Sequence, residues 1–110
     1  MSAGEVEELV NQNKEITVLD VRNEDEYLSQ HLDLVNLQHI PLDQLNQRME
    51  EVQDHEKVYV HCAGGYRSPI AMSMLKARGV HNVVNIKGGL AALNETTLNK
   101  SKYVCPSSLL

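Results

Sequence analysis

Short apolar runs alternate along the chain with segments in which apolar residues recur three or four positions apart. The nearly continuous runs predict buried strands over residues 16–21, 57–61 and 83–86, and a further strand is expected over residues 34–40. The segments between them are typical of helices that bury one side against a sheet. This alternation predicts an α/β domain with a mainly parallel central sheet, flanked by helices on both faces.

Capping residues mark where two helices near the N-terminus begin. Ser2 and Glu5 are spaced as a capping box, which predicts a helix that runs to about residue 12. Asn23 and Glu26 have the same spacing and predict a short second helix.

Three more helices are expected further along the chain. One runs from residue 43 to about residue 51, with its apolar side formed by Leu42, Leu45 and Met49. The next begins with Ser68 as its N-cap and ends before Gly79, which suits the position after a last helical turn. Its inward side would carry Ile70, Ala71, Met74 and Leu75. The last helix begins over residues 90–93, after a Gly-Gly turn.

Length and composition are those of a small domain with an aliphatic core. The 110 residues predict a single domain with a core over about residues 6–93, and residues 99–110 are expected to form a loosely ordered tail. Apolar residues make up 42% of the chain, but Phe and Trp are absent. Val, Leu, Ile, Met and Ala must therefore fill the core.

Charge and cysteine content indicate which partners and which cellular compartment to expect. The net charge is −5 without a cluster of Lys or Arg, so we expect neither nucleic acid nor a membrane surface as partner. The N-terminus lacks the pattern of a leader, and no apolar run approaches the roughly 18 residues of a membrane span. Two cysteines are too few for a disulfide framework. We therefore expect a cytoplasmic protein with free thiols.

Cys62 is the candidate nucleophile. It follows the strand expected over residues 57–61, at the carboxyl end where sites lie in parallel sheets, and precedes a short loop and a helix. Loop N–H groups and the positive end of that helix should converge near its sulfur. A free thiol with pKa about 8.5 becomes largely thiolate at neutral pH in such a setting, and the thiolate is the reactive form.

The loop Ala63-Gly64-Gly65-Tyr66-Arg67 and Ser68 are the expected substrate-binding residues. Both glycines are interpreted as positions that need positive φ and a close approach to the sulfur. Arg67 has two equally supported uses, to orient an anionic substrate or to pair with a carboxylate such as Glu26. Tyr66 either forms a wall of the pocket or is an exposed loop aromatic.

Other residues with possible chemistry are given supporting or structural roles. Asp20 and Arg22 follow a strand and are interpreted as a structural ion pair beside the site. His61 should point away from Cys62, because neighbours on a strand face opposite sides, and is expected to lie in the core or on the back face of the sheet. The other histidines lack the spacing of metal ligands, so neither a metal nor another cofactor is expected. Cys105 is interpreted as incidental rather than as a resolving thiol.

The loop Cys-Ala-Gly-Gly-Tyr-Arg-Ser resembles the active-site loop of the rhodanese family, the sulfurtransferases, in its small single-domain members. Other fragments occur in the order that this family has. They are Leu19–Arg22, Glu26–Tyr27, His31 and Ile40–Leu42 before the loop, and Ala71, Leu75, Gly79, Asn82–Val83 and Gly88–Gly89 after it. The resemblance extends from about Val6 to Leu93.

This resemblance implies a sulfurtransferase. Cys62 would take a sulfane sulfur from a small donor such as thiosulfate, form a persulfide and pass the sulfur to cyanide or a thiol, with Asp20, Arg22 and Glu26 supporting the site. A sulfur-relay protein is a further candidate partner.

Two other functions stay open. The chain could be a non-enzymatic sulfur carrier or protein-recognition module. Cysteine phosphatases and arsenate reductases use a similar loop, but a phosphatase signature has five residues between Cys and Arg, whereas this chain has four. A tetrahedral oxyanion would then fit poorly, so this alternative ranks lowest.

Overall fold

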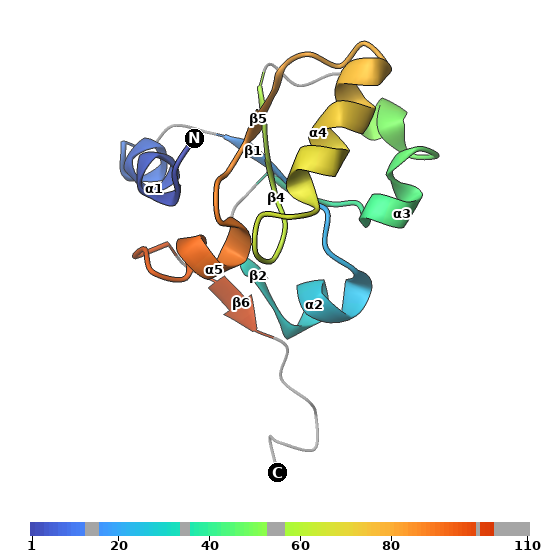
Figure 1. Ribbon diagram of the computed structural model, residues 1–110. Coiled ribbons are helices and arrows are strands. Elements are labelled where there is room, and N and C mark those ends of the chain that lie inside the picture. The colour runs from blue at the N-terminus through green and yellow to red at the C-terminus, as the bar shows by residue number, and fades with distance from the viewer. Residues whose placement is uncertain (13–15, 34–35, 53–56, 99, 103–110) are drawn as a thin grey trace.

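Four parallel strands form the central sheet in the order β3-β1-β4-β5, and Figure 1 labels three of them, β1, β4 and β5. The computed structural model describes residues 1–12, 16–33, 36–52, 57–98 and 100–102. The strands of the sheet are β1 (Thr17–Asp20), β3 (Leu37–His39), β4 (Val58–His61) and β5 (Val83–Asn85). The expected mainly parallel sheet is confirmed, and β4, the strand that leads to Cys62, is buried along its whole length.

Helices cover both faces of the sheet and give two apolar clusters. On one face lie α3 (Leu42–Leu45), the 3-10 helix η1 (Met49–Glu51) and α4 (Ser68–Ala77). On the other lie α1 (Ala3–Asn11) and α5 (Gly89–Leu93). Val18 and Leu19 illustrate the alternation, because these neighbours on β1 belong to different clusters. None of the helices in the described ranges is long and apolar enough to span a bilayer.

Capping side chains explain where the two helices nearest the N-terminus begin. Ser2 accepts a hydrogen bond from the backbone N–H of Glu5 at the start of α1, which is one half of the capping box expected there. α2 (Glu24–Ser29) begins with the complete capping box of Asn23 and Glu26. This short helix follows β1 at the carboxyl end of the sheet, where it reaches the loop after β4.

The prediction of one continuous helix over residues 43–51 is wrong. This segment is divided into α3 and η1, because the chain tightens after Leu45: the N–H of Arg48 bonds to carbonyls three and four residues back, and the N–H of Glu51 to one three back. This path still buries Leu45 and Met49, which is why their spacing fitted a single helix.

The strand expected over residues 34–40 is shorter in the structure, where β3 spans Leu37–His39, and residues 34–35 lie outside the described residues. A second, antiparallel sheet was not anticipated. It joins β2 (Gln30–Leu32) to β6 (Lys100–Lys102).

Two expectations for α4 are corrected. Its N-cap is Arg67 and no side chain caps it, because the Ser68 hydroxyl lies 3.6 Å from the Cys62 sulfur instead. Ile70 is 54% exposed, since Ala71 and Leu75 occupy the inner side of the helix. The end of α4 before Gly79, with φ of 87°, is as expected.

Candidate active site

The carboxyl ends of β1 and β4 bring the candidate residues together. Asp20 and His61 are register partners at the ends of these strands, and Cys62 is the next residue along the chain. Cys62 is only 1% exposed, so its thiol lies within the floor of the loop rather than on the surface.

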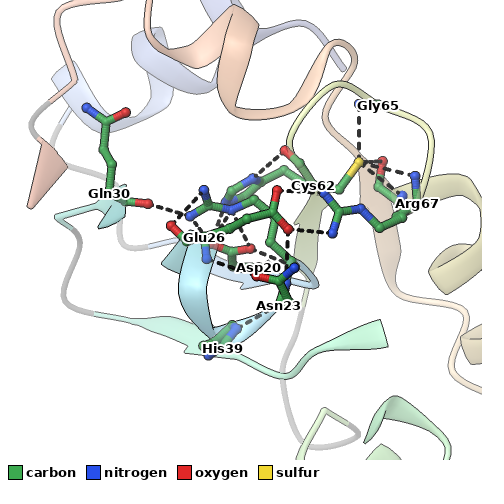
Figure 2. Close-up of polar contacts among 11 residues, drawn as sticks. Asp20, Asn23, Glu26, Gln30, His39, Cys62, Gly65 and Arg67 are labelled. Atoms are coloured by element: carbon green, nitrogen blue, oxygen red, sulfur yellow. Dashed lines mark hydrogen bonds and ion pairs between the residues drawn. The ribbon is translucent and has the colours of Figure 1, made fainter. Parts of the chain in front are cut away.

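Backbone N–H groups of the loop surround the sulfur of Cys62 (Figure 2). Sγ accepts hydrogen bonds from the N–H groups of Gly65, Arg67 and Ser68 at 3.2, 3.3 and 3.3 Å. Burial raises the pKa of the Cys62 thiol, but these N–H groups and the Ser68 hydroxyl lower it, and the net pKa lies below its ordinary value. The loop therefore favours a thiolate at Cys62.

The first turn of α5 donates hydrogen bonds to the backbone at the start of the loop that follows β4. The N–H of Leu90 donates to the carbonyl of Cys62 at 2.7 Å, and that of Ala91 to the carbonyl of Ala63 at 3.0 Å. This approach requires Gly89, because a Cβ there would overlap the Cys62 carbonyl oxygen and lie 2.8 Å from the Ala63 carbonyl carbon. The sequence indicated only a turn at this position, and nothing local in it signalled contact with Cys62.

The two loop glycines differ. Gly65 has φ of 93° and its N–H lies 3.2 Å from the Cys62 sulfur, as expected, and a Cβ on it would also lie 3.3 Å from the N of Gly88, a contact that was not anticipated. The same expectation is wrong for Gly64, which has no positive φ and whose Cβ would only touch the Tyr66 ring at 3.7 Å. Tyr66 itself is 87% exposed and takes the second of its two expected roles.

Arg67 pairs with Glu26 of α2 through two hydrogen bonds. Nη1 donates to Oε1 at 2.6 Å and Nη2 to Oε2 at 2.8 Å, with both side chains about one-third exposed. The contact with Arg67 lowers the pKa of Glu26, and the same contact raises the pKa of Arg67. Of the two uses that the sequence left open, the structure shows the carboxylate pair.

Asp20 and Arg22 form the second ion pair, which is buried. Nη2 of Arg22 lies 2.7 Å from Oδ2 of Asp20, and the Nε of Arg22 donates to both carboxylate oxygens. The guanidinium also donates to the carbonyls of Glu26 and Gln30 at 3.2 and 2.6 Å. Arg22 thereby connects the end of β1 to the end of α2, in agreement with the structural role inferred from the sequence.

His61, next to Cys62 in the chain, lies fully buried, so of its two expected positions it takes the one in the core. Its Nδ1 lies 3.2 Å from the Cys62 carbonyl oxygen and must donate to it, while Nε2 lies 3.8 Å from Oδ2 of Asp20. Burial lowers the pKa of His61, so the ring is neutral at pH 7. Because Nδ1 is committed to the backbone, His61 is not placed as a base for the Cys62 thiol.

A stack of three rings beside α2 was missed in the sequence. Tyr27 stacks between His31 and His39, with ring centroids 4.1 and 4.2 Å apart, and Nε2 of His39 donates to the carbonyl of Arg22 at 2.8 Å. These rings come from three elements, so spacing along the chain gave no signal. In the described ranges no group of three or more His, Cys, Asp or Glu side chains could hold a metal ion. Cys105 lies outside the described residues.

Curated relatives contain this domain within longer chains. YrkF of Bacillus subtilis (strain 168) is named as a candidate sulfur carrier protein. It is 31% identical to this chain, and the aligned region covers 74% of this chain and 43% of YrkF. A tRNA uridine(34) hydroxylase of Buchnera aphidicola is 30% identical over 82% of this chain, which covers 30% of that protein. The chain thus spans about half or less of these relatives.

Solved structures have the same fold and align with most of this chain. A rhodanese-like domain protein from Staphylococcus aureus is 27% identical with a TM-score of 0.78, covering 90% of this chain and 94% of that one. A thiosulfate sulfurtransferase from Pseudomonas aeruginosa is 29% identical with a TM-score of 0.72, covering 90% of this chain and 19% of that one. The sequence model of the rhodanese-like domain family matches residues 2–96, and the chain therefore belongs to that family.

Proposed function

We propose that this protein is a sulfurtransferase in which Cys62 carries the sulfur as a persulfide. The observation that carries the proposal is the set of three backbone N–H groups directed at the Cys62 sulfur. Fixed donors of this kind stabilise a thiolate before the reaction and an anionic sulfur after it. A relative among the thiosulfate sulfurtransferases supports the same chemistry.

The reaction has two displacement steps. The Cys62 thiolate attacks the outer sulfur of a donor such as thiosulfate, a new S–S bond forms, and the donor's S–S bond breaks with its electron pair leaving on sulfite. An acceptor such as cyanide or a thiolate then attacks the outer sulfur of the persulfide. With cyanide, thiocyanate leaves and the Cys62 thiolate is restored. The loop over residues 63–68 binds the transferred sulfur, while Asp20 and Arg22 hold α2 in place and Glu26 orients Arg67.

The first test is the intact mass of the protein after thiosulfate, and again after cyanide. Wild type should gain one sulfur atom and lose it to cyanide as thiocyanate. Cys62→Ser should gain none while keeping its fold by circular dichroism. Cys105→Ser is the matched control and should behave as wild type. Loading that persists in Cys62→Ser would overturn the mechanism.

A second test concerns the thiolate itself. Because the loop N–H groups hold the pKa of Cys62 below its usual range, its alkylation by iodoacetamide should reach half its maximal rate below about pH 8.5. Cys62→Ser identifies the part of the signal that comes from Cys105. A midpoint at or above the ordinary thiol value would contradict the proposed activation.

The alternative is a sulfur carrier that loads once and passes its sulfur to a protein, which the name of YrkF favours. Repeated formation of thiocyanate by one molecule supports an enzyme, whereas loading without turnover supports the carrier. Both require a reduced thiol, which fits the cytoplasmic location expected from the sequence and a sulfur-relay protein as partner.

A further inference from the structure

Arg67 is the basic residue of the loop that carries Cys62, yet its charge is already matched. Both of its terminal nitrogens bond to the carboxylate of Glu26, at 2.6 and 2.8 Å (Figure 2). This contact occupies the edge formed by Nη1 and Nη2, one of the two-pronged edges with which guanidinium groups hold anions. A doubly charged donor would have to displace Glu26 or bind without that edge.

The surroundings of the pair also disfavour a second negative charge. The first turn of α2 carries Glu24 and Asp25 as well as Glu26, but Glu24 and Asp25 are exposed and Glu26 is the one that bonds to Arg67. A cleft of about 290 Å³ opens beside Arg67 and has a further carboxylate, Asp43, in its lining. Its other lining residues are the polar Asn23 and the apolar Val21, Pro41 and Leu42. Such a cleft accepts an organic group more readily than a charge that it would desolvate.

We propose that the Glu26–Arg67 pair makes Cys62 select donors that carry a single negative charge and an organic group, such as thiosulfonates and organic persulfides, over the thiosulfate dianion. This inference rests on the sulfur transfer proposed above. The organic group lies in the cleft beside Arg67. Glu26 is a positioning residue here, because it acts through the charge and orientation of Arg67.

The transfer from a thiosulfonate balances. The Cys62 thiolate attacks the outer sulfur, a new S–S bond forms, and the donor's S–S bond breaks with its electron pair leaving on a sulfinate. The persulfide anion stays on Cys62, so two negative charges are present before and after the step. With thiosulfate the same step gathers three negative charges, which a neutralised Arg67 offsets poorly.

The test compares thiosulfate with methanethiosulfonate, two donors that end in the same sulfane sulfur and differ by one charge. We would measure kcat/KM for each with cyanide as acceptor. Glu26→Gln, which can still cap α2, should raise the thiosulfate-to-methanethiosulfonate ratio about tenfold, because it removes one charge near the donor. Arg67→Gln, which keeps the backbone N–H at the sulfur, should lower the ratio by a similar factor.

Glu24→Gln is the matched control, because it removes one charge from the same turn of α2 but leaves the pair in place. Its ratio should stay within about twofold of wild type. A ratio that Glu26→Gln leaves unchanged, or that Glu24→Gln shifts as far, overturns the selectivity while sulfur transfer stands. If Glu26→Gln does not fold, the sign of the change in Arg67→Gln decides. Failure of both donors to load wild type would overturn both proposals.

Discussion

Two arginine–carboxylate pairs meet α2 at the carboxyl end of the sheet, and they differ in exposure. The side chains of Arg22 and Asp20 are 4% and 0% exposed, whereas those of Arg67 and Glu26 are 33% and 31% exposed. Arg22 also satisfies two carbonyls of the chain around α2. The buried pair therefore connects the elements around α2, whereas the exposed pair is the one that we propose acts on the choice of donor.

The largest effect should follow from Asp20→Asn. It keeps the size of the side chain but leaves the buried guanidinium of Arg22 without its counter-charge, which should cost about 3–5 kcal/mol of unfolding free energy. Chemical denaturation measures this loss. Glu51→Gln, which breaks the exposed pair of Arg48 and Glu51, serves as the control and should show no measurable loss. Equal losses in the two variants would erase the distinction between the pairs.

The Glu26–Arg67 pair should contribute far less to stability. A double-mutant cycle of Glu26→Gln and Arg67→Gln, followed by denaturation, should give a coupling free energy below about 1 kcal/mol, since solvent screens side chains of this exposure. A coupling as large as the loss in Asp20→Asn would mean that the pair is structural, and that its effect on donor choice is secondary.

The smallest effect is the pH dependence of that pair. Arg67 lowers the folded pKa of Glu26, so the stabilisation is complete above the unfolded pKa of about 4.3 and is lost as pH falls through the lower folded value. The difference in unfolding free energy between wild type and Glu26→Gln should therefore be constant near neutral pH and shrink below about pH 4. A difference that grows on acidification would contradict the direction of this linkage.

Much of the parallel sheet was predictable because β1, β4 and β5 lie within nearly continuous apolar runs, whereas β3 is Leu-Gln-His. The β2–β6 pair was not, since three-residue strands with mixed polarity pair across some seventy positions of sequence. The division into α3 and η1 was also hidden, because Leu45 and Met49 have the spacing of an α-helix and reach the core by another path.

Cys62 and its loop were predictable because the chemistry is local: a strand, a glycine-bearing turn and a helix follow one another. The choice between the two uses of Arg67 was not, because Glu26, the carboxylate suggested for it, lies 41 positions earlier and only the fold brings the two side chains together. Gly64 and Gly65 look alike in sequence, and only the backbone path distinguishes the one with positive φ.

The contact of α5 with the loop also restricts how this loop could be re-engineered. The carbonyls of Cys62 and Ala63 accept hydrogen bonds from the N–H groups of Leu90 and Ala91. These carbonyls lie so close to Gly89 that no side chain would fit at that position. An inserted residue that widened the loop to the length found in phosphatases would have to enter after Ala63, within residues 64–67. Lengthening the loop there would disturb N–H groups that now bond to the sulfur, so a change of substrate from sulfur to phosphorus would require the anion site to be rebuilt.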